Sequence, residues 1–267
     1  MRIAANLSML FTELPLIDRI DAAASAGFDG VEIQFPYEVP ARTLNAELAR
    51  CNMPLVLINL PAGDFINGGA GLSAIPSKQI EFNSALEQAL KYAEVARPRY
   101  VNVLAGRIGH GLCRETATDQ LAVNVRKAAE IFEPLGIQVL VEMINTLDVP
   151  GYLIDTPMGL DDLLKRVDHP NCGAQLDIYH LARQGFDVDS EIRTLKRYIK
   201  HVQFADCPGR GEPGSGELDL FSAVRALREI GYDDWMSAEY KPVNMHKSLQ
   251  WLSTWREWPQ VRGCNNG

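Results

Sequence analysis

The sequence predicts a single parallel (β/α)8 barrel, and three observations indicate it. Short apolar segments alternate with amphipathic segments eight times along the chain, the pattern of a barrel with parallel strands. The length of 267 residues suits one such barrel. No linker-like stretch divides the chain, so we expect one domain over residues 1–267. A doubly wound open sheet is the alternative, and the lack of a Gly-x-Gly-x-x-Gly phrase after the first strand disfavours it.

The strands are recognised as short, mainly apolar runs that end in turn residues. A run such as Leu55-Val56-Leu57-Ile58 has no polar residue, as expected of a strand that is covered on both faces. The predicted strands cover residues 3–7, 30–35, 55–61, 100–105, 138–145, 172–178, 201–206 and 235–240.

The helices are recognised from apolar residues that recur three or four positions apart. The clearest stripe runs from Leu121 to Leu135 and is ended by Gly136. Thr156 followed by Pro157 is typical of an N-cap and a first helical position. The predicted helices lie within residues 17–26, 42–50, 82–93, 121–135, 157–167, 192–199, 221–230 and 249–255.

Composition excludes several classes of function. The formal net charge is −8, and a surface for nucleic acid or anionic membrane would need a clustered basic patch. No apolar segment approaches the roughly 20 residues of a membrane span. The chain starts in a strand-like run without a signal peptide, and its 5 cysteines form no Cys-x-x-Cys pair. We therefore expect a cytoplasmic protein with free thiols, and a frayed, polar tail at residues 261–267.

One phrase recurs three times, in residues 26–32, 135–142 and 230–239. In each, a glycine ends a helix and an apolar strand then carries a glutamate near its far end. Strand propensity does not explain a glutamate there, because glutamate is depleted in strands and costly in a core. The recurring pairs are Gly27 with Glu32, Gly136 with Glu142, and Gly231 with Glu239.

Catalytic groups of such barrels lie at the C-terminal ends of the strands. The polar residues at those ends are Asn6, Glu32, Asn59, Glu142, Asn145, Asp177, His180, Gln203, Asp206 and Glu239. The three carboxylates that end strands five, six and eight would repel one another unless a cation or protons neutralised them. With the Gln203 amide the ligands would all be oxygen, which favours Mg²⁺ or Mn²⁺. The alternative for any one of them is a salt bridge on the rim.

A glycine- and proline-rich loop follows the seventh strand, and Arg210 is its only cation. A guanidinium suits a substrate carboxylate, although an exposed loop arginine is an equal alternative. Glu212 could orient Arg210 or His180. His180, three residues after Asp177, suits contact with a substrate oxygen or with a backbone group.

Two glutamates that face each other across a bound ketone indicate one kind of chemistry. A metal would acidify the carbon beside the carbonyl, one glutamate would remove its proton, and a carboxyl group would return a proton to the adjacent carbon. Such proton transfer through an enediolate is aldose–ketose isomerisation.

The chain resembles the hydroxypyruvate isomerase family, within the xylose-isomerase-like TIM-barrel superfamily. The likeness runs from end to end and rests on the phrases at residues 5–11, 59–64, 144–152, 177–180, 210–217 and 239–242. The resemblance implies interconversion of hydroxypyruvate and tartronate semialdehyde, as part of glyoxylate metabolism. It implies a divalent metal on Glu142, Asp177, Gln203 and Glu239, with Glu142 and Glu239 as the acid/base pair.

The remaining site residues are expected to bind a small 2-oxo or hydroxy acid, and they are Asn6, Asn59, His180, Arg210 and Glu212. A sister group that isomerises 2-oxo-tetronates is the alternative function. Two other classes of protein are alternatives. DNA-repair endonucleases of the same superfamily need a basic face for phosphates. Non-catalytic sugar-acid binding proteins need no opposed glutamates. Neither nucleic acid nor membrane is expected as a partner, and a homo-oligomer is compatible with the sequence.

Overall fold

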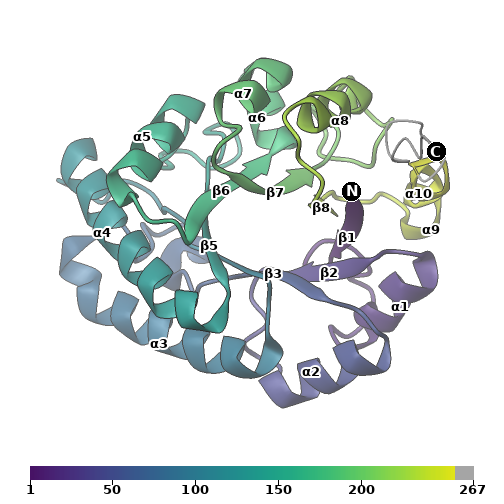
Figure 1. Cartoon of the computed structure of the whole chain (residues 1–267), viewed down its shortest axis with the longest axis horizontal. Helices are drawn as coiled ribbons and strands as arrows, with labels where there is room; N and C mark the ends of the chain where they lie inside the picture. Colours follow the sequence, from purple (N-terminus) through teal and green to yellow (C-terminus); the bar gives the residue numbers. More distant parts are fainter. Residues whose placement is uncertain (256–267) are drawn as a thin grey trace.

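Eight parallel strands close into a barrel in their order along the chain, which confirms the predicted TIM barrel (Figure 1). The computed structural model describes residues 1–255, and the tail expected at residues 261–267 lies outside this range. Strand β1 pairs with both β2 and β8, so the sheet has no free edge. The strands are β1 (Arg2–Asn6), β2 (Gly30–Ile33), β3 (Leu55–Asn59), β4 (Tyr100–Asn102), β5 (Gln138–Glu142), β6 (Cys172–Asp177), β7 (Ile199–Phe204) and β8 (Trp235–Ala238).

The helices form a ring around the barrel (Figure 1). They are α1 (Asp18–Ala26), α2 (Ala41–Arg50), α3 (Gln79–Ala96), α4 (Arg114–Phe132), α5 (Pro157–Val167), α6 (Ile178–Gln184), α7 (Val188–Thr194), α8 (Leu220–Glu229), α9 (Met245–Ser248) and α10 (Gln250–Trp255). Three short 3₁₀ helices add η1 (Gly63–Asn67), η2 (Pro76–Lys78) and η3 (Glu133–Leu135). None of the helices in residues 1–255 combines the length and the apolar character needed to cross a membrane.

The predicted start signal at Thr156 and the predicted stop signals at three glycines are confirmed. The Thr156 hydroxyl accepts a hydrogen bond from the Gly159 amide at 3.1 Å, which caps α5. The three glycines of the recurring phrase all adopt the left-handed conformation, with φ of 93°, 68° and 82° for Gly27, Gly136 and Gly231. Because only glycine adopts this conformation without cost, each helix stops there and the chain turns back into the barrel.

The structure corrects the predicted elements in two places. A helix, α6, follows Asp177 directly, where the sequence predicted only the end of a strand. The Asp177 carboxylate accepts from the Tyr179 amide at 2.8 Å and so begins this helix. The helix predicted over residues 192–199 is wrong at its end, because α7 stops at Thr194 and Ile199 opens β7.

The barrel interior is apolar at one end and polar at the other. A separate apolar cluster draws on five strands, and its inward-facing members fill the barrel interior: Ala4, Leu57, Tyr100, Leu140 and Trp235. Two positions further along the strands, on the same face, the side chains are polar, as with Asn6, Asn102 and Glu142. The cluster thus forms a floor beneath a polar layer at the C-terminal ends of the strands.

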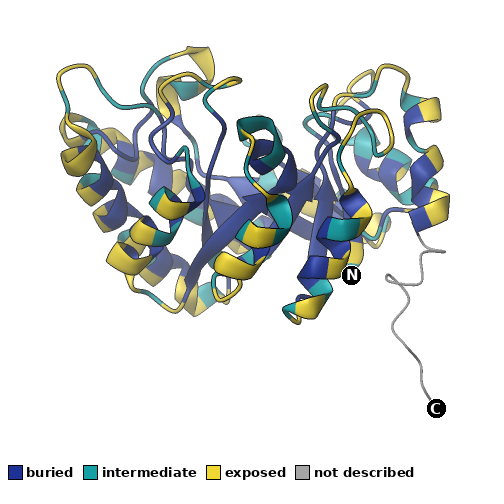
Figure 2. Ribbon diagram, turned by 90° about the horizontal axis from the view of Figure 1, so that it is seen from above, coloured by how far each residue is buried: buried dark blue, intermediate teal, exposed yellow. Residues whose placement is uncertain are grey.

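A second, larger core lies between the strands and the helices, where buried residues cover the outer side of the barrel (Figure 2). Its C-terminal part is aromatic. The ring of Phe204 stacks on that of Trp255 with centroids 5.8 Å apart and meets Trp251 edge-on at 5.4 Å. These contacts dock α10 against β7.

The floor allows no side chain at Gly30, and this generates a stability prediction. A Cβ atom there would lie 2.7 Å from the Trp235 ring and 3.1 Å from the Pro54 carbonyl oxygen. We expect Gly30→Ala to lower the free energy of unfolding by about 1–3 kcal/mol through overpacking, although alanine is otherwise the better strand residue. Urea denaturation measures this. Gly209→Ala, where a Cβ would meet no atom within 4 Å, is the control, and equal midpoints for both variants would contradict the packing argument.

Candidate active site

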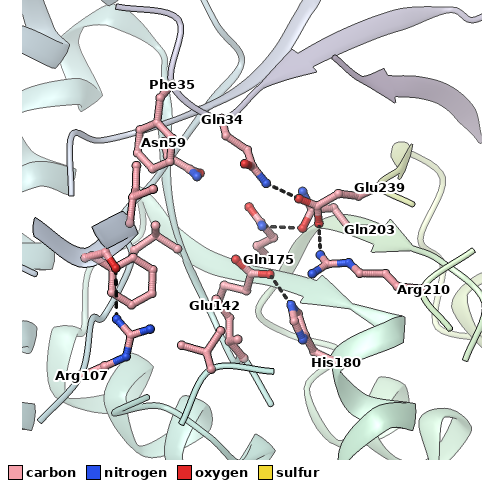
Figure 3. A pocket seen from close by; sticks show the side chains of 15 residues that line it. Gln34, Phe35, Asn59, Arg107, Glu142, Gln175, His180, Gln203, Arg210 and Glu239 are labelled. Atoms are coloured by element: carbon pink, nitrogen blue, oxygen red, sulfur yellow. Dashed lines mark hydrogen bonds and ion pairs between the residues drawn. The ribbon is translucent and has the colours of Figure 1, made fainter. Parts of the chain in front are cut away.

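A cavity of about 320 Å³ opens where the C-terminal ends of the strands meet (Figure 3). One wall is apolar and includes Phe35, Phe65 and Leu104. The polar lining comes from loops and from the ends or continuations of six strands: Gln34, Asn59, Arg107, Glu142, Gln175, His180, Gln203, Arg210 and Glu239. This volume is at the lower end of the range for small-molecule sites, so the cavity suits a small substrate.

Two of the predicted carboxylates, those of Glu142 and Glu239, line this cavity, and the third, that of Asp177, lies close to them without lining it. Glu142 ends β5, Asp177 ends β6 and Glu239 directly follows β8, and each side chain is buried. Ligand atoms of Glu142, Asp177 and His180 lie within 4.8 Å of one another. The strand ends therefore bring together the acidic residues that the sequence singled out.

Crowding and burial make these carboxylates hard to ionise together. Burial, with the nearby charges of Glu239 and Asp177, raises the pKa of Glu142 well above its usual value. Burial also raises the pKa of Glu239 to about 8, although Arg210 opposes this shift. Both glutamates can therefore hold a proton near neutral pH, as an acid/base pair requires.

Arg210 is the cation that faces this acidic cluster. Its Nη2 donates to Glu239 Oε2 at 2.9 Å and lies 3.5 Å from Asp177 Oδ2. Gln34 Nε2, at 2.5 Å, and Asn6 Nδ2, at 3.1 Å, donate to the other oxygen of Glu239. Arg210 thus balances carboxylate charge, a role that the sequence did not predict for it.

The loop that carries Arg210 is built around Asp206. The Asp206 carboxylate accepts from the backbone amides of Cys207, Gly214 and Leu218 at 2.8–3.0 Å. Arg210 itself has a φ of 54°, which is unfavourable for a residue with a side chain. The Lys241 amide donates to the Arg210 carbonyl at 2.7 Å and helps to hold this conformation. Asp206 therefore positions the loop instead of lining the cavity.

His180 is buried beside the carboxylates and is neutral near pH 7. Burial lowers the pKa of His180 to about 4. Asn145 Nδ2 lies 2.6 Å from His180 Nδ1, and the same amide group donates to Asp148 Oδ2 at 3.1 Å. This arrangement makes Nδ1 the acceptor, so Nε2 carries the proton and faces Asp177 Oδ2 at 3.5 Å. A protonated Nε2 suits donation to a substrate oxygen better than metal ligation.

A buried polar network lies beneath the cavity. Glu32 Oε1 accepts from Gln203 Nε2 at 2.7 Å and from Asn6 Nδ2 at 2.8 Å, while Oε2 lies 2.9 Å from His201 Nε2. Burial is the largest influence and raises the pKa of Glu32, but the contacts with His201, Ser237 and Gln203 together outweigh it and lower that pKa. Because the Gln203 NH₂ group faces Glu32, its carbonyl oxygen faces Gln175 Nε2, at 2.6 Å.

The other predicted substrate-binding residues differ in position. Asn59 lines the cavity, but Asn6 lies beneath it and bridges Glu32 and Glu239. Glu212 is not among the residues that line the cavity, and its backbone carbonyl accepts from the Ser215 hydroxyl. Three further polar residues that line the cavity were not predicted as site residues from the sequence: Gln34, Arg107 and Gln175.

Strand alternation could have found two of these three. Gln34 lies two positions after Glu32, and Gln175 two positions before Asp177, so each shares the inward face with a predicted site residue. Arg107 follows the end of β4 by several residues and lies in a loop, where no periodicity applies. Its place at the cavity depends on contacts with other loops.

The donor set fits a hard divalent cation. Three carboxylates and the amide oxygens of Gln203 and Gln175 gather in one buried place, and hard ions prefer such oxygen ligands. The Gln175 Oε1 atom is buried and has no hydrogen-bond partner within residues 1–255, although buried carbonyl oxygens normally have one. Glu142 and Asp177, together with His180, lie near enough to one another to hold one ion, and Gln203 and Glu239 remain predicted ligands.

Comparisons with known proteins show the family and the fold of the chain. The family model described as xylose isomerase-like TIM barrel matches residues 20–255. The hydroxypyruvate isomerase of Escherichia coli (strain K12) is 35% identical over 260 residues, which cover 96% of this chain and 100% of the relative. The 2-oxo-tetronate isomerase of Haemophilus influenzae is 35% identical over 90% of this chain and 93% of its own. The crystal structure of a family 2 AP endonuclease from Brucella melitensis has a TM-score of 0.91 and 38% identity, covering 95% of this chain and 98% of that one.

The buried network predicts a large effect of Glu32→Gln on stability. The substitution keeps the shape of the side chain but removes the charge that faces His201 at 2.9 Å. Replacing a buried carboxylate that accepts several hydrogen bonds leaves its donors without a charged acceptor and typically lowers the free energy of unfolding by about 1.5–3 kcal/mol, which urea denaturation measures. Glu87→Gln, which breaks the exposed pair with Lys91, is the matched control and should leave the midpoint unchanged. A stable Glu32→Gln protein would show that the network carries little of the stability.

Proposed function

Because the chain belongs to the hydroxypyruvate isomerase family of xylose isomerase-like TIM barrels and is an isomerase, we propose that it interconverts hydroxypyruvate and tartronate semialdehyde. A sugar-acid isomerase is the activity class that its relatives share. The observation that carries the choice of mechanism is the placement of Glu142 and Glu239, which reach one small cavity from β5 and β8 (Figure 3).

The reaction moves hydrogen between two neighbouring carbons. One glutamate carboxylate takes the proton from C3 of hydroxypyruvate, and the electron pair of that C–H bond forms the enediolate. A glutamic acid then delivers a proton to C2, while the hydroxyl proton passes from the C3 oxygen to the C2 oxygen. The product is an aldehyde at C3 and a hydroxyl at C2, and no oxidant or reductant is consumed.

The raised pKa values of the two glutamates suit these steps. Burial places the pKa of Glu239 at about 8 and that of Glu142 well above its usual value, so either group can act as base or acid near neutral pH. The protein also holds them in place: Asn102 Nδ2 donates to Glu142 Oε2 at 3.2 Å, and Gln34 and Asn6 donate to Glu239.

A divalent metal, Mg²⁺ or Mn²⁺, would be held by Glu142, Asp177, Gln203 and Glu239. When bound, it would polarise the substrate carbonyl and stabilise negative charge on the neighbouring oxygens. The chain's own residues fix the ligands: Glu32 orients the Gln203 amide, and the Tyr179 amide orients Asp177. Such outer contacts set ligand geometry in metal sites.

His180 and Arg210 are proposed to bind the substrate oxygens at the reacting carbons. The His180 Nε2–H group faces the carboxylate cluster at 3.5 Å from Asp177, where a substrate hydroxyl or carbonyl would lie. The Arg210 Nε atom is buried and has no partner within residues 1–255, so it remains available as a donor. Asn59 offers a further amide at the cavity.

Other functions fit this site less well. A polynucleotide would bring phosphates to a cavity lined by Glu142 and Glu239, with Asp177 close by, in a chain with a net charge of −8. A binding protein for sugar acids has no need of two buried glutamates with raised pKa values. A cytoplasmic location and a homo-oligomer remain predictions from the sequence.

Proton NMR in D₂O with hydroxypyruvate tests the activity. We expect tartronate semialdehyde with deuterium at C2, because the catalytic carboxyl groups exchange their protons with solvent. EDTA should abolish the conversion, and added Mg²⁺ or Mn²⁺ should restore it. Unchanged hydroxypyruvate with every metal would refute the proposed substrate, whereas full activity in EDTA would remove the metal from the mechanism.

Replacing either glutamate tests the acid/base assignment. Glu142→Gln and Glu239→Gln remove a titrating group while keeping its shape, so we expect kcat to fall by about 10²–10⁴-fold or more. Circular dichroism melting should show a folded protein in both cases. Glu87→Gln, on the outer surface of α3, is the control and should keep wild-type kcat. A folded variant with normal kcat would exclude that glutamate from proton transfer.

A further inference from the structure

Arg107 is a cation at the cavity that no carboxylate neutralises. Within residues 1–255 its side-chain hydrogen bonds all go to backbone carbonyls: Nη1 donates to Phe65 O at 3.1 Å and Gly69 O at 2.8 Å, and Nε donates to Pro150 O at 3.2 Å. No acidic group lies within ion-pair distance of it in this part of the chain. Its full positive charge is therefore left to act on the cavity that it lines.

Arg210 is in the opposite situation. Its guanidinium lies against Glu239 at 2.9 Å and Asp177 at 3.5 Å, so its charge is already balanced. A substrate carboxylate placed beside Arg210 would also lie beside those two carboxylates and be repelled by them. Figure 3 shows Arg107 on the other side of the cavity, away from Arg210 and Glu239. The cavity thus has an acidic end and a separate basic wall.

The position of Arg107 is fixed by loops that follow three different strands. The Arg107 amide donates to the Ala70 carbonyl at 2.9 Å, and the residue forms a β-bridge with Tyr152. Its guanidinium lies over the Phe65 ring, 4.7 Å from the centroid. With Nε and Nη1 committed to carbonyls, Nη2 is the remaining donor edge, and a guanidinium held in this way loses little entropy on binding an anion.

We propose that Arg107 binds the carboxylate of the substrate and is the residue that makes the enzyme specific for 2-oxo acids over neutral ketoses of the same length. This inference rests on the proposed function. The carboxylate at Arg107 directs the carbonyl and hydroxyl carbons toward Glu142, Glu239 and His180. The substrate charge is thereby placed as far as the cavity allows from the acidic cluster.

The test compares Arg107→Met, Arg107→Lys and Arg114→Met. Methionine keeps the apolar stem and loses the charge, and lysine keeps the charge and loses the planar guanidinium. Arg114 is the matched control, because it donates to the Leu153 carbonyl and pairs with Asp155 in the neighbouring loop without lining the cavity. Melting temperatures of all three report any loss of loop packing.

Steady-state kinetics supply the first measurement. Loss of a charge-assisted contact should raise the KM for hydroxypyruvate about 10–100-fold in Arg107→Met with a smaller change in kcat, and less in Arg107→Lys. Arg114→Met should keep the wild-type KM. A wild-type KM in Arg107→Met would overturn the proposal, as would an equal rise in Arg114→Met, which would indicate loop packing alone.

Calorimetry separates failure of this inference from failure of the proposed function. Hydroxypyruvate binding is measured in Glu142→Gln protein, which cannot turn it over, with and without Arg107→Met. Binding that weakens about 10–100-fold with Arg107→Met supports the carboxylate contact even where the wild-type protein fails to isomerise hydroxypyruvate. Equal affinity of the two proteins for hydroxypyruvate refutes the carboxylate contact at Arg107 and leaves the isomerase proposal intact. If the Glu142→Gln parent does not bind hydroxypyruvate at all, the substrate is wrong for both proposals.

Discussion

The constraint on which the site depends is the burial of three carboxylates close to one another at one small cavity. Glu142, Asp177 and Glu239 repel one another, and burial makes each charge more costly. The protein offsets this cost with one guanidinium, that of Arg210, and with amide donors such as Gln34 that point at Glu239. The compensation is incomplete, because both glutamates keep raised pKa values. That remaining cost favours the binding of a proton there, and it would favour a divalent cation in the same way.

The barrel interior supplies the conditions for this arrangement. Its apolar floor, with Tyr100 and Trp235, excludes water from below and so strengthens every electrostatic contact above it. Directly over the floor, Glu32 and His201 form a pair that is shielded from solvent, and Glu32 in turn holds Gln203 and Asn6. Along a strand, the apolar floor, the layer of Glu32 and His201, and the polar lining of the cavity are separated by steps of two residues, because alternate side chains face the barrel interior. A substitution at Glu32 or His201 would therefore affect the residues at the cavity through the amide side chains of Gln203 and Asn6.

Sequence reasoning succeeded where one local rule determines the outcome. A glycine that ends a helix and a glutamate in an apolar strand are both visible along the chain, and they placed Glu142 and Glu239 correctly at the cavity. It missed features set by contacts between distant segments. The pairing of Arg210 with Glu239 depends on how a loop after β7 folds back, and the helix after Asp177 depends on a side-chain cap. Loop residues have no periodicity, so Arg107 carried no signal.

The two arginines of the cavity show why residue type alone does not assign a role. Both present a guanidinium to the same small volume, yet Arg210 faces carboxylates, whereas within residues 1–255 the hydrogen bonds of the Arg107 side chain all go to backbone carbonyls. An anionic substrate responds to the uncompensated charge, so its carboxylate turns toward Arg107 and its reacting carbons toward the glutamates. The same separation of charge disfavours the reverse orientation, in which a carboxylate would meet Glu239. The electrostatic asymmetry of the cavity thus selects both the class of substrate and the direction in which it binds.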